Sequence, residues 1–271
     1  MQPVLALERF YNRVLPGAPG SFAGTRVIRW FIRKGHARAP IVRGEESVRL
    51  EFVPGDHLDV LLRELELRGS WEPTITALLR RYVPEGGVFI DVGANIGYYS
   101  LLASSWVGDS GRVIAFEPLA QTFARLLRHI EMNGAKNVVP LRLACAASAG
   151  ARRMLTFADS GWSHLATGGT EGEQVEATTI DDTIASLNPA RVDVLKIDAE
   201  GADFEVLRGA RRTLEHFRPT VLMETHHLHR FGATVEMVRD FLHSLDYEIS
   251  PLTHDYSSDL LANPSGRPDS S

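Results

Sequence analysis

The chain has 271 residues, of which 44% are hydrophobic and 23% charged, a composition that is ordinary for a globular protein and leaves room for one large α/β domain with an extension. Its single cysteine, Cys145, excludes an intrachain disulfide, and its apolar runs are far shorter than the ~20 residues that span a bilayer. The net charge is −5, and the N-terminus lacks the pattern of a secretory signal. These features predict a cytoplasmic protein without a membrane span.

Residues 1–70 are predicted to form an N-terminal extension of helices and a short strand pair. Helices are expected at 1–15, 22–34 and 57–67. Val48, Leu50 and Phe52 alternate with polar residues, as in a half-buried strand. Eight Arg and Lys residues against one acid give residues 1–43 a net charge of +7. An ordinary solvated helix face explains this charge, but the segment is also a candidate contact for an anionic partner, a membrane surface or a second copy of the chain.

Residues 71–256 are predicted to form the main domain, in which short apolar runs alternate with helical patterns. Strands are expected at 88–90, 112–116, 138–143, 192–197, 220–223 and 247–249. Helices are expected at 98–106, 122–133, 179–186, 203–217 and 235–245, with a further helix opening at Pro73. This alternation predicts an α/β fold, a Rossmann-like, mostly parallel sheet with helices on both faces.

Two other segments interrupt or follow this pattern. Residues 152–180 are predicted to be a β-hairpin insert, because the strand-like runs 154–157 and 174–178 flank a glycine-rich stretch. Residues 257–271 are rich in Ser, Pro, Asp and Gly, and this composition predicts a disordered tail.

In a doubly wound sheet, ligands bind outside the carboxyl ends of the strands, where the strand order reverses. The residues that directly follow the predicted strands are therefore the candidates for a site. They are acidic and glycine-rich rather than basic: residues 91–97, Glu117, Ala144 with Cys145, residues 198–201 and residues 224–227.

The first strand runs into the segment Asp91-Val-Gly93-Ala-Asn95-Ile-Gly97. Its glycines allow a tight turn and a close approach of a ligand to the backbone. A carboxylate at Asp91 would repel the pyrophosphate of a dinucleotide, whereas it would attract the ammonium and sulfonium groups of S-adenosylmethionine. The segment therefore favours a cationic cofactor.

Glu117 follows the second strand, 20 residues after Gly97. A carboxylate at this place accepts hydrogen bonds from the two hydroxyls of a ribose. NAD and S-adenosylmethionine sites share this feature, so Glu117 supports a nucleoside cofactor without deciding which one. Ala144, after the third strand, is assigned to the same cofactor site.

Three segments together resemble the FkbM-type methyltransferases. They are residues 89–100 (FIDVGANIGYYS), residues 115–118 (AFEP) and residues 195–210 (LKIDAEGADFEVLRGA). The resemblance extends over about residues 70–250. It implies a class I methyltransferase fold and O-methylation of a hydroxyl on a small molecule, typically a natural product or a sugar.

The resemblance also implies which residues bind S-adenosylmethionine. Carried over to this chain, they are Asp91, Gly93, Asn95, Gly97 and Glu117. Glu72, in the run Ser-Trp-Glu-Pro, corresponds to a family position near the cofactor, and its alternative role is that of a helix N-cap before Pro73.

The acceptor side of the site is expected at the ends of the fourth and fifth strands. Asp198 is placed to orient or deprotonate a hydroxyl, and Glu200 to assist; the alternative is that both only cap the next helix. His226 is the candidate general base of the histidine cluster, with His227 as its neighbour in the same role. Lys196 is expected to face a helix or the sheet edge rather than act as a catalytic amine.

No metal ligand is assigned. Some O-methyltransferases use Mg²⁺, so a divalent ion held by Asp198, Glu224 and a histidine is possible but not favoured. A nucleic-acid substrate is not expected, because the core is acidic and phosphate backbones require Lys and Arg. The alternatives to an O-methyltransferase are a catalytically inactive cofactor-binding scaffold and an NAD(P)-dependent oxidoreductase on a similar fold.

Overall fold

The structure, a computed structural model of the whole chain, describes residues 41–51, 71–156, 163–165, 172–253 and 258–266. The helices predicted at 1–15, 22–34 and 57–67 lie outside the described residues. The chain divides into two compact units, one of residues 1–71 with 158–161 and one of residues 72–157 with 162–271.

The described part of the first unit is a small antiparallel pair of strands. β1 (Ile41–Arg43) pairs with β2 (Arg49–Glu51), and the short 3-10 helix η1 (Glu45–Ser47) connects them. Leu50 is buried while both of its neighbours in β2 are half-buried. The short strand pair predicted for this region is therefore confirmed.

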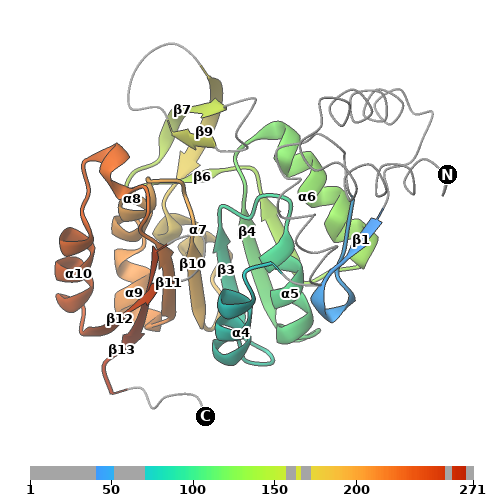
Figure 1. Cartoon of the computed structure of the whole chain (residues 1–271), viewed down its shortest axis with the longest axis horizontal. Helices are drawn as coiled ribbons and strands as arrows, with labels where there is room; N and C mark the ends of the chain where they lie inside the picture. Colours follow the sequence, from blue (N-terminus) through green and yellow to red (C-terminus); the bar gives the residue numbers. More distant parts are fainter. Residues whose placement is uncertain (1–40, 52–70, 157–162, 166–171, 254–257, 267–271) are drawn as a thin grey trace, which may run out of the picture. The chain divides into compact units, whose positions relative to one another are not determined.

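The second unit contains a seven-stranded sheet in the order β12-β13-β11-β10-β3-β4-β5 (Figure 1). Its strands are β3 (Val88–Val92), β4 (Arg112–Phe116), β5 (Val138–Leu141), β10 (Val194–Ile197), β11 (Thr220–Glu224), β12 (Tyr247–Thr253) and β13 (Ser258–Pro264). Only β13 runs against the others, and it pairs antiparallel with both β11 and β12. The mostly parallel sheet predicted from the alternating pattern is confirmed.

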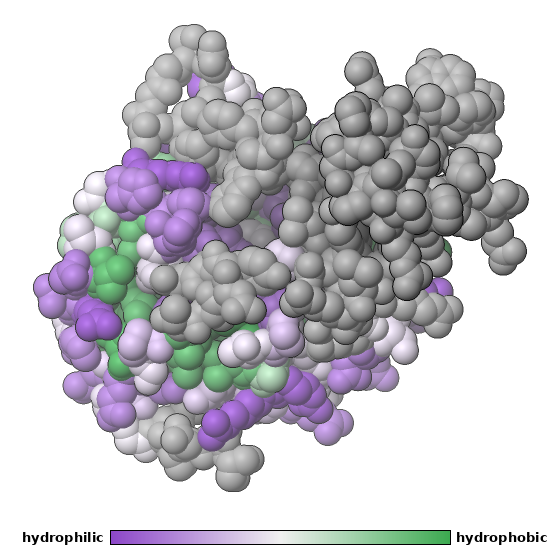
Figure 2. All heavy atoms as spheres, viewed as in Figure 1, coloured by the Kyte–Doolittle hydropathy of each residue, from purple (hydrophilic) through white to green (hydrophobic). Residues whose placement is uncertain are grey.

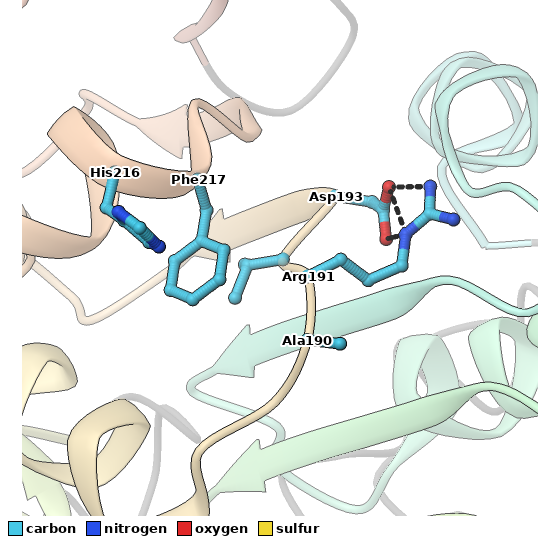
Figure 3. A pocket seen from close by; sticks show the side chains of 6 residues that line it. Ala190, Arg191, Asp193, His216 and Phe217 are labelled. Carbon is cyan, nitrogen blue, oxygen red and sulfur yellow. Dashed lines mark hydrogen bonds and ion pairs between the residues drawn. The ribbon is translucent and has the colours of Figure 1, made fainter.

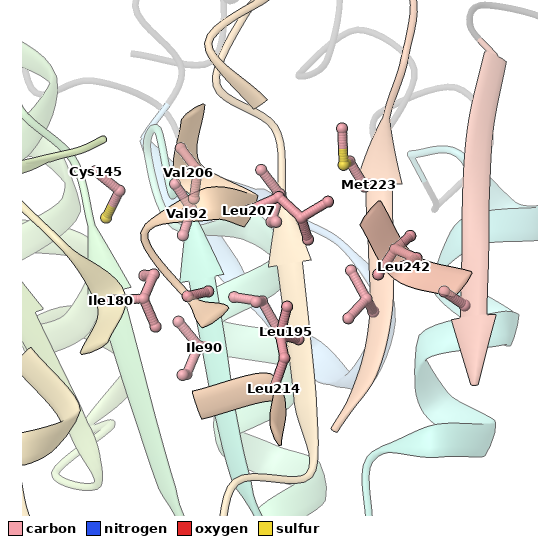
Figure 4. Close-up of a cluster of buried hydrophobic side chains, with 14 of the residues drawn as sticks. Ile90, Val92, Cys145, Ile180, Leu195, Val206, Leu207, Leu214, Met223 and Leu242 are labelled. Carbon is pink, nitrogen blue, oxygen red and sulfur yellow. The ribbon is translucent and has the colours of Figure 1, made fainter. Parts of the chain in front are cut away.

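Successive side chains of a strand point to opposite faces, so a strand with apolar side chains throughout needs cover on both faces. Helices provide this cover on the two faces of the sheet. The helices are α4 (Pro73–Tyr82), α5 (Tyr98–Val107), α6 (Ala120–Asn133), α7 (Ile180–Leu187), α8 (Asp203–Arg208), α9 (Arg211–Phe217) and α10 (Val235–His243). Ile90 belongs to a buried cluster with apolar side chains of α7, α8, α9 and α10 (Figure 4). Its neighbour Asp91 lies on the other face, where the hydroxyl of Ser100 in α5 donates to it.

The prediction of one continuous helix at 203–217 is wrong, because the structure has two helices in this range. α8 ends at Arg208 and α9 begins at Arg211. At Gly209 the backbone passes so close to the Ala146 carbonyl that any Cβ would overlap its oxygen. The break thus follows from a close contact between two segments that are distant in sequence.

The disordered tail predicted at 257–271 is also wrong for the described residues 258–264. They form β13, which lies between β11 and β12. Leu260, Leu261 and Ala262 are buried there. The polar composition around these three residues concealed a short strand that has partners on both sides.

A second, four-stranded sheet has the order β6-β9-β7-β8. β7 (Gly150–Thr156) pairs antiparallel with β9 (Glu173–Thr178), as the predicted hairpin requires. The prediction was incomplete, because the stretch between them contains a third strand, β8 (Ser163–Leu165), which also pairs antiparallel with β7. The strand predicted at 138–143 ends at Leu141 in β5. Ala144 and Cys145, which directly follow the predicted strand, form the short strand β6 and pair parallel with β9.

Figure 2 shows the face of the molecule seen in Figure 1, coloured by hydropathy. Hydrophilic side chains dominate the described surface in this view, and the hydrophobic ones form smaller patches between them. Phe204 of α8 and Phe241 of α10 pack edge to face, with ring centroids 6.0 Å apart.

Candidate functional site

The strand order of the large sheet reverses between β3 and β10. From β3 the chain proceeds outward to β4 and β5, whereas β10 and β11 lie on the opposite side. The carboxyl ends of these parallel strands carry Asp91, Glu117, Asp198 and Glu224. A crevice at such a reversal is where open α/β sheets bind ligands, so the structure brings the predicted site residues to the expected edge.

The loop after β3 has an unusual backbone conformation. Gly93, Asn95 and Gly97 have φ values of 76°, 52° and 96°. The amides of Gly93 and Ala94 donate to the Phe116 carbonyl at 3.1 and 2.9 Å. Gly93 also lies directly against the Asp198 carbonyl, where a Cβ would overlap the oxygen. The loop is thereby held between β4 and β10, with its backbone close to the crevice.

Glu117 is 6% exposed and is tied to the loop through its carboxylate. Oε2 accepts from the Asn95 amide at 3.1 Å and Oε1 from the Leu119 amide at 2.9 Å. Burial raises the pKa of Glu117 to about 7, although both hydrogen bonds lower it. The side-chain oxygen of Asn95 is also buried, and it has no hydrogen-bond partner among the described residues. Hydrogen-bond donors of a bound polar molecule would compensate the buried carboxylate of Glu117 and the buried oxygen of Asn95. These residues therefore suit a cofactor that carries a diol.

Asp91 is fully buried, and its carboxylate faces Ser100 and Lys196. Ser100 donates to its Oδ2 at 2.6 Å, and its Oδ1 lies 3.6 Å from the Lys196 ammonium. Lys196 pairs with Asp91 in the register of β3 and β10, and it also contacts Asp198 Oδ2 at 3.2 Å. Burial raises the pKa of Asp91, and Lys196 and Ser100 oppose this rise. Lys196 faces helix α5, as predicted, but its amine lies inside the site.

Glu72 occupies the N-cap position of α4, yet its side chain makes no capping hydrogen bond. Its backbone is left-handed, with φ 46°, and its Oε2 accepts from the Tyr99 hydroxyl at 2.6 Å. Of the two roles left open by the sequence, capping is therefore not the one that the side chain performs. Tyr99 connects Glu72 to the site, since the Lys196 ammonium lies 5.0 Å from the centre of the Tyr99 ring.

The turn after β10 presents Asp198 and Glu200. Asp203 holds this turn by accepting from the Ala199 and Gly201 amides at 2.7 and 2.8 Å. Neither Asp198 nor Glu200 caps α8, whose N-cap Ala202 has no side-chain cap. The Asp198 side chain is 42% exposed, so its carboxylate is accessible.

Glu200 faces the segment that follows β11. Its Oε2 lies 3.7 Å from the Arg230 guanidinium and 3.8 Å from His227 Nε2. Arg230 belongs to the 3-10 helix η2 (Leu228–Phe231). His227 is buried, and burial lowers its pKa to about 4, so its imidazole is neutral near pH 7. The predicted base His226 is exposed, and its ring centroid lies 4.4 Å from that of His227.

Glu224 is the last residue of β11 and adds a further carboxylate at this edge of the sheet. It lies one residue beyond the last residue of β11 that pairs with β10. It pairs with Asp259 across β11 and β13. Burial, together with the nearby carboxylates of Asp198, Asp203 and Glu200, raises the pKa of Glu224 to about 10. Its Oε2 is buried without a hydrogen-bond partner among the described residues. Glu224 is therefore protonated near pH 7 and can donate a hydrogen bond.

The pKa of Glu200 gives a testable prediction about stability. Burial raises it from 4.5 to about 8, so Glu200 contributes stability below pH 4.5 that is lost as the pH rises through 8. Glutamine cannot ionise. We therefore expect Glu200→Gln to gain on the order of a few kcal/mol relative to wild type between pH 4 and pH 9. Urea unfolding at both pH values measures this difference.

Glu131→Gln is the matched control, because Glu131 is exposed on α6 and the same exchange there lies outside the site. If Glu200→Gln changed the free energy of unfolding between pH 4 and pH 9 no more than this control does, the buried environment assigned to Glu200 would be incorrect.

Sequence reasoning missed Tyr99, Ser100 and Lys196 as members of the site. Tyr99 and Ser100 lie in the first turn of α5, directly after the glycine loop, and this position was the available signal. Ala144 is buried in β6 with Cys145, whose side chain packs in the core (Figure 4). The cofactor contact predicted for Ala144 stays a prediction.

Two searches of the described part of the chain bear on other functions. No group of three or more His, Cys, Asp or Glu residues in that part has an arrangement that could hold a metal ion. Among the same residues, none of the helices combines the length and the apolar character needed to cross a membrane.

A hollow of about 540 Å³ lies at the opposite edge of the sheet, where β10 begins (Figure 3). Arg191, Asp193, His216 and Phe217 line it. Asp193 is committed to the fold there, because it accepts from the Val88 amide at 2.8 Å and from the Arg191 guanidinium. This hollow contains none of the residues at the carboxyl ends of the strands.

Comparison with known proteins gives consistent matches. The family described as "Methyltransferase FkbM domain" matches residues 91–249. The hexuronic acid methyltransferase AglP of Haloferax volcanii is 27% identical, over 72% of this chain and 78% of its own length. Methyltransferase sdnD of Sordaria araneosa is 27% identical, over 53% of this chain and 68% of its own length.

A solved structure, the methyltransferase FkbM from Methylobacillus flagellatus, aligns with a TM-score of 0.47 and 20% sequence identity. The alignment covers 66% of this chain and 44% of that chain, so this chain matches less than half of that protein's length.

Proposed function

Because the chain belongs to the FkbM methyltransferase family, we propose that it transfers a methyl group from S-adenosylmethionine to a hydroxyl oxygen of a small molecule, a sugar or another natural product. Membership of this family argues against an NAD(P)-dependent oxidoreductase, which the sequence left open as an alternative. The observation that carries the proposal is the position of Asp198, which lies accessible beside the loop 93–97 and Asp91.

The cofactor would be held by residues of β3, β4 and the loop between β3 and α5. Glu117 would accept from the ribose hydroxyls, and Gly93, Asn95 and Gly97 would line the cofactor with backbone and amide groups. Asp91 and Glu72 supply negative charge for the cationic part. When bound, S-adenosylmethionine supplies an electrophilic methyl group, which the acceptor oxygen takes while the electron pair of the broken bond stays on sulfur.

Asp198 would orient the acceptor and accept its hydroxyl proton as the new carbon–oxygen bond forms. One of its oxygens, Oδ2, is engaged by Lys196, and the side chain is exposed enough to meet an acceptor. Glu200 lies two residues further on the same turn and would assist in binding the acceptor. His226 is exposed next to the site and is the alternative proton acceptor.

We favour a carbohydrate acceptor with a carboxylate. The relative AglP is named for hexuronic acid methylation. In this chain the segment after β11 carries Arg230, half-buried beside Glu200, together with the exposed His226 and His229. A guanidinium suits a carboxylate on a small acceptor. We propose neither a nucleic-acid substrate nor a metal requirement.

Calorimetric titration of the full chain with S-adenosylmethionine, S-adenosylhomocysteine and NADPH tests the cofactor. We expect the first two to bind and NADPH not to bind. The variant Asp91→Asn, which keeps the side-chain shape, should weaken binding of S-adenosylmethionine. Binding of NADPH alone would overturn the proposal.

Methyl β-D-glucuronoside and its uncharged counterpart methyl β-D-glucoside test the acceptor, with methyl transfer followed from labelled S-adenosylmethionine. We expect transfer to the glucuronoside, also in the presence of EDTA. Transfer to the glucoside at an equal rate would contradict the carboxylate-bearing acceptor while leaving the sugar O-methyltransferase intact.

A further inference from the structure

Lys196 is a buried cation in the centre of the large sheet. Its residue is 5% exposed, and it lies on β10, flanked by β3 and β11. The Lys196 ammonium is 3.2 Å from Asp198 Oδ2 and 3.6 Å from Asp91 Oδ1. The ring of Tyr99 covers it at 5.0 Å. The ammonium therefore lies between the carboxylate assigned to the cofactor and the carboxylate assigned to the acceptor.

An ammonium group that is taken out of water needs compensation. Burial alone lowers the pKa of Lys196, but Asp198, Asp91 and Glu72 outweigh burial, and the net shift is upward. Lys196 therefore stays protonated and does not act as a base. It also separates Asp91 from Asp198, two carboxylates that would repel each other in its absence.

We propose that Lys196 is a positioning residue for methyl transfer, whose ammonium group holds Asp198 in the orientation that meets the acceptor hydroxyl. The proposal rests on the function proposed above and adds a role for a residue on the central strand. Because Lys196 engages Oδ2, the other oxygen of Asp198 is left to the acceptor.

Tyr99 and Glu72 fix the ammonium from its other side. The Tyr99 hydroxyl is held by Glu72 at 2.6 Å, so its ring keeps one orientation over Lys196. The aromatic face attracts the cation and leaves it with two carboxylates as its ion-pair partners. The orientation of the Lys196 ammonium is therefore set by contacts within the protein and does not depend on a bound ligand.

The first test compares Lys196→Met and Lys196→Arg with Lys136→Met, an exposed lysine that serves as the control. In Lys196→Met we expect kcat for methyl β-D-glucuronoside to fall about 100-fold, because a misplaced catalytic group costs that much. The Kd for S-adenosylhomocysteine should rise by a smaller factor than kcat falls, because the lost contact with Asp91 also affects the cofactor side. Lys196→Arg, which keeps the charge, should recover part of kcat. Equal losses of kcat and of binding in Lys196→Met, or an unchanged kcat, would overturn the proposal.

A second test needs neither turnover nor a Lys196 variant that folds. The chain contains only three lysines, Lys34, Lys136 and Lys196, so the ammonium NMR signals are few. We expect a slowly exchanging Lys196 signal in the wild type that shifts and exchanges faster in Asp198→Asn. An unchanged signal would show that Asp198 and Lys196 are not coupled and would overturn the inference.

The two proposals fail in different ways. A wild-type protein that does not bind S-adenosylhomocysteine contradicts the proposed function. A wild type that binds it and methylates the glucuronoside, with Lys196→Met equally active, contradicts only the role of Lys196. If the wild type binds the cofactor but does not methylate the glucuronoside, the NMR comparison of the Lys196 ammonium signal between wild type and Asp198→Asn tests the role of Lys196.

Discussion

Replacing Gly93 by alanine is expected to destabilise the protein by more than about 4 kcal/mol, a loss in the range that marks severe structural damage. Gly93 has φ 76°, where side chains are strained, and an added Cβ would overlap the Asp198 carbonyl oxygen. That oxygen belongs to the backbone, so it moves only if the end of β10 moves. The loop 93–97 would lose its place between β4 and β10, and because we propose that this loop lines the cofactor, binding of S-adenosylhomocysteine should be lost as well.

Urea unfolding and calorimetry measure the two effects in the same variant. Gly134→Ala is the matched control, because Gly134 has φ 65° and nothing lies within 4 Å of its added Cβ. The control pays only for the left-handed backbone, about 1 kcal/mol. If Gly93→Ala were no less stable than Gly134→Ala and still bound S-adenosylhomocysteine, the close approach of the loop to β10 would not exist in solution.

Asp198→Asn is expected to lower kcat about 1000-fold, within the range that general base catalysis contributes. The amide keeps the shape of the side chain but does not accept the hydroxyl proton. The residues of β3 and β4 to which we assign cofactor binding remain in place, so the affinity for S-adenosylhomocysteine should change by no more than a few fold. Steady-state methylation of methyl β-D-glucuronoside and calorimetry measure the two quantities.

Asp109→Asn serves as the control for this exchange. Asp109 is exposed in the turn before β4, at the opposite edge of the sheet from Asp198. We expect this variant to keep the wild-type kcat. If Asp198→Asn also kept it, the proton would pass to another group, and His226 would become the first candidate.

The position of the candidate site could be predicted from the sequence because it depends on local signals. Each strand of a parallel sheet reads as a short apolar run, and the polar residue after it must lie at one common edge. Asp91, Glu117 and Asp198 were found in this way, and the structure brings all three to the edge beside the reversal of strand order. The glycine loop carries its own signal, since Gly93 and Gly97 adopt backbone angles that other residues avoid.

The role that we propose for Lys196 could not be predicted from the sequence, because it depends on which strands are neighbours. Within its own strand, Lys196 is a polar residue in an apolar run. Only the register of β10 against β3 sets it opposite Asp91, and only the packing of α5 brings Tyr99 over it. Similarly, the direction of the turn after β11 decides that His227 is buried and His226 exposed.

The tail was misread for a related reason. Leu260, Leu261 and Ala262 are too few to stand out from the polar residues around them, and their burial depends on partners on both sides. A strand of this kind has no signal until β11 and β12 are known to leave a place between them.

The place of β13 between β11 and β12 has a consequence for the order in which the sheet assembles during synthesis. β12 leaves the ribosome before β13, yet β13 is its only partner among the described strands. The N-terminal part of the sheet can assemble during synthesis, but the edge that carries Glu224 is completed only when residues 258–264 have been released. Nascent chains stalled shortly before this strand should therefore expose an open sheet edge and depend on chaperones until translation resumes.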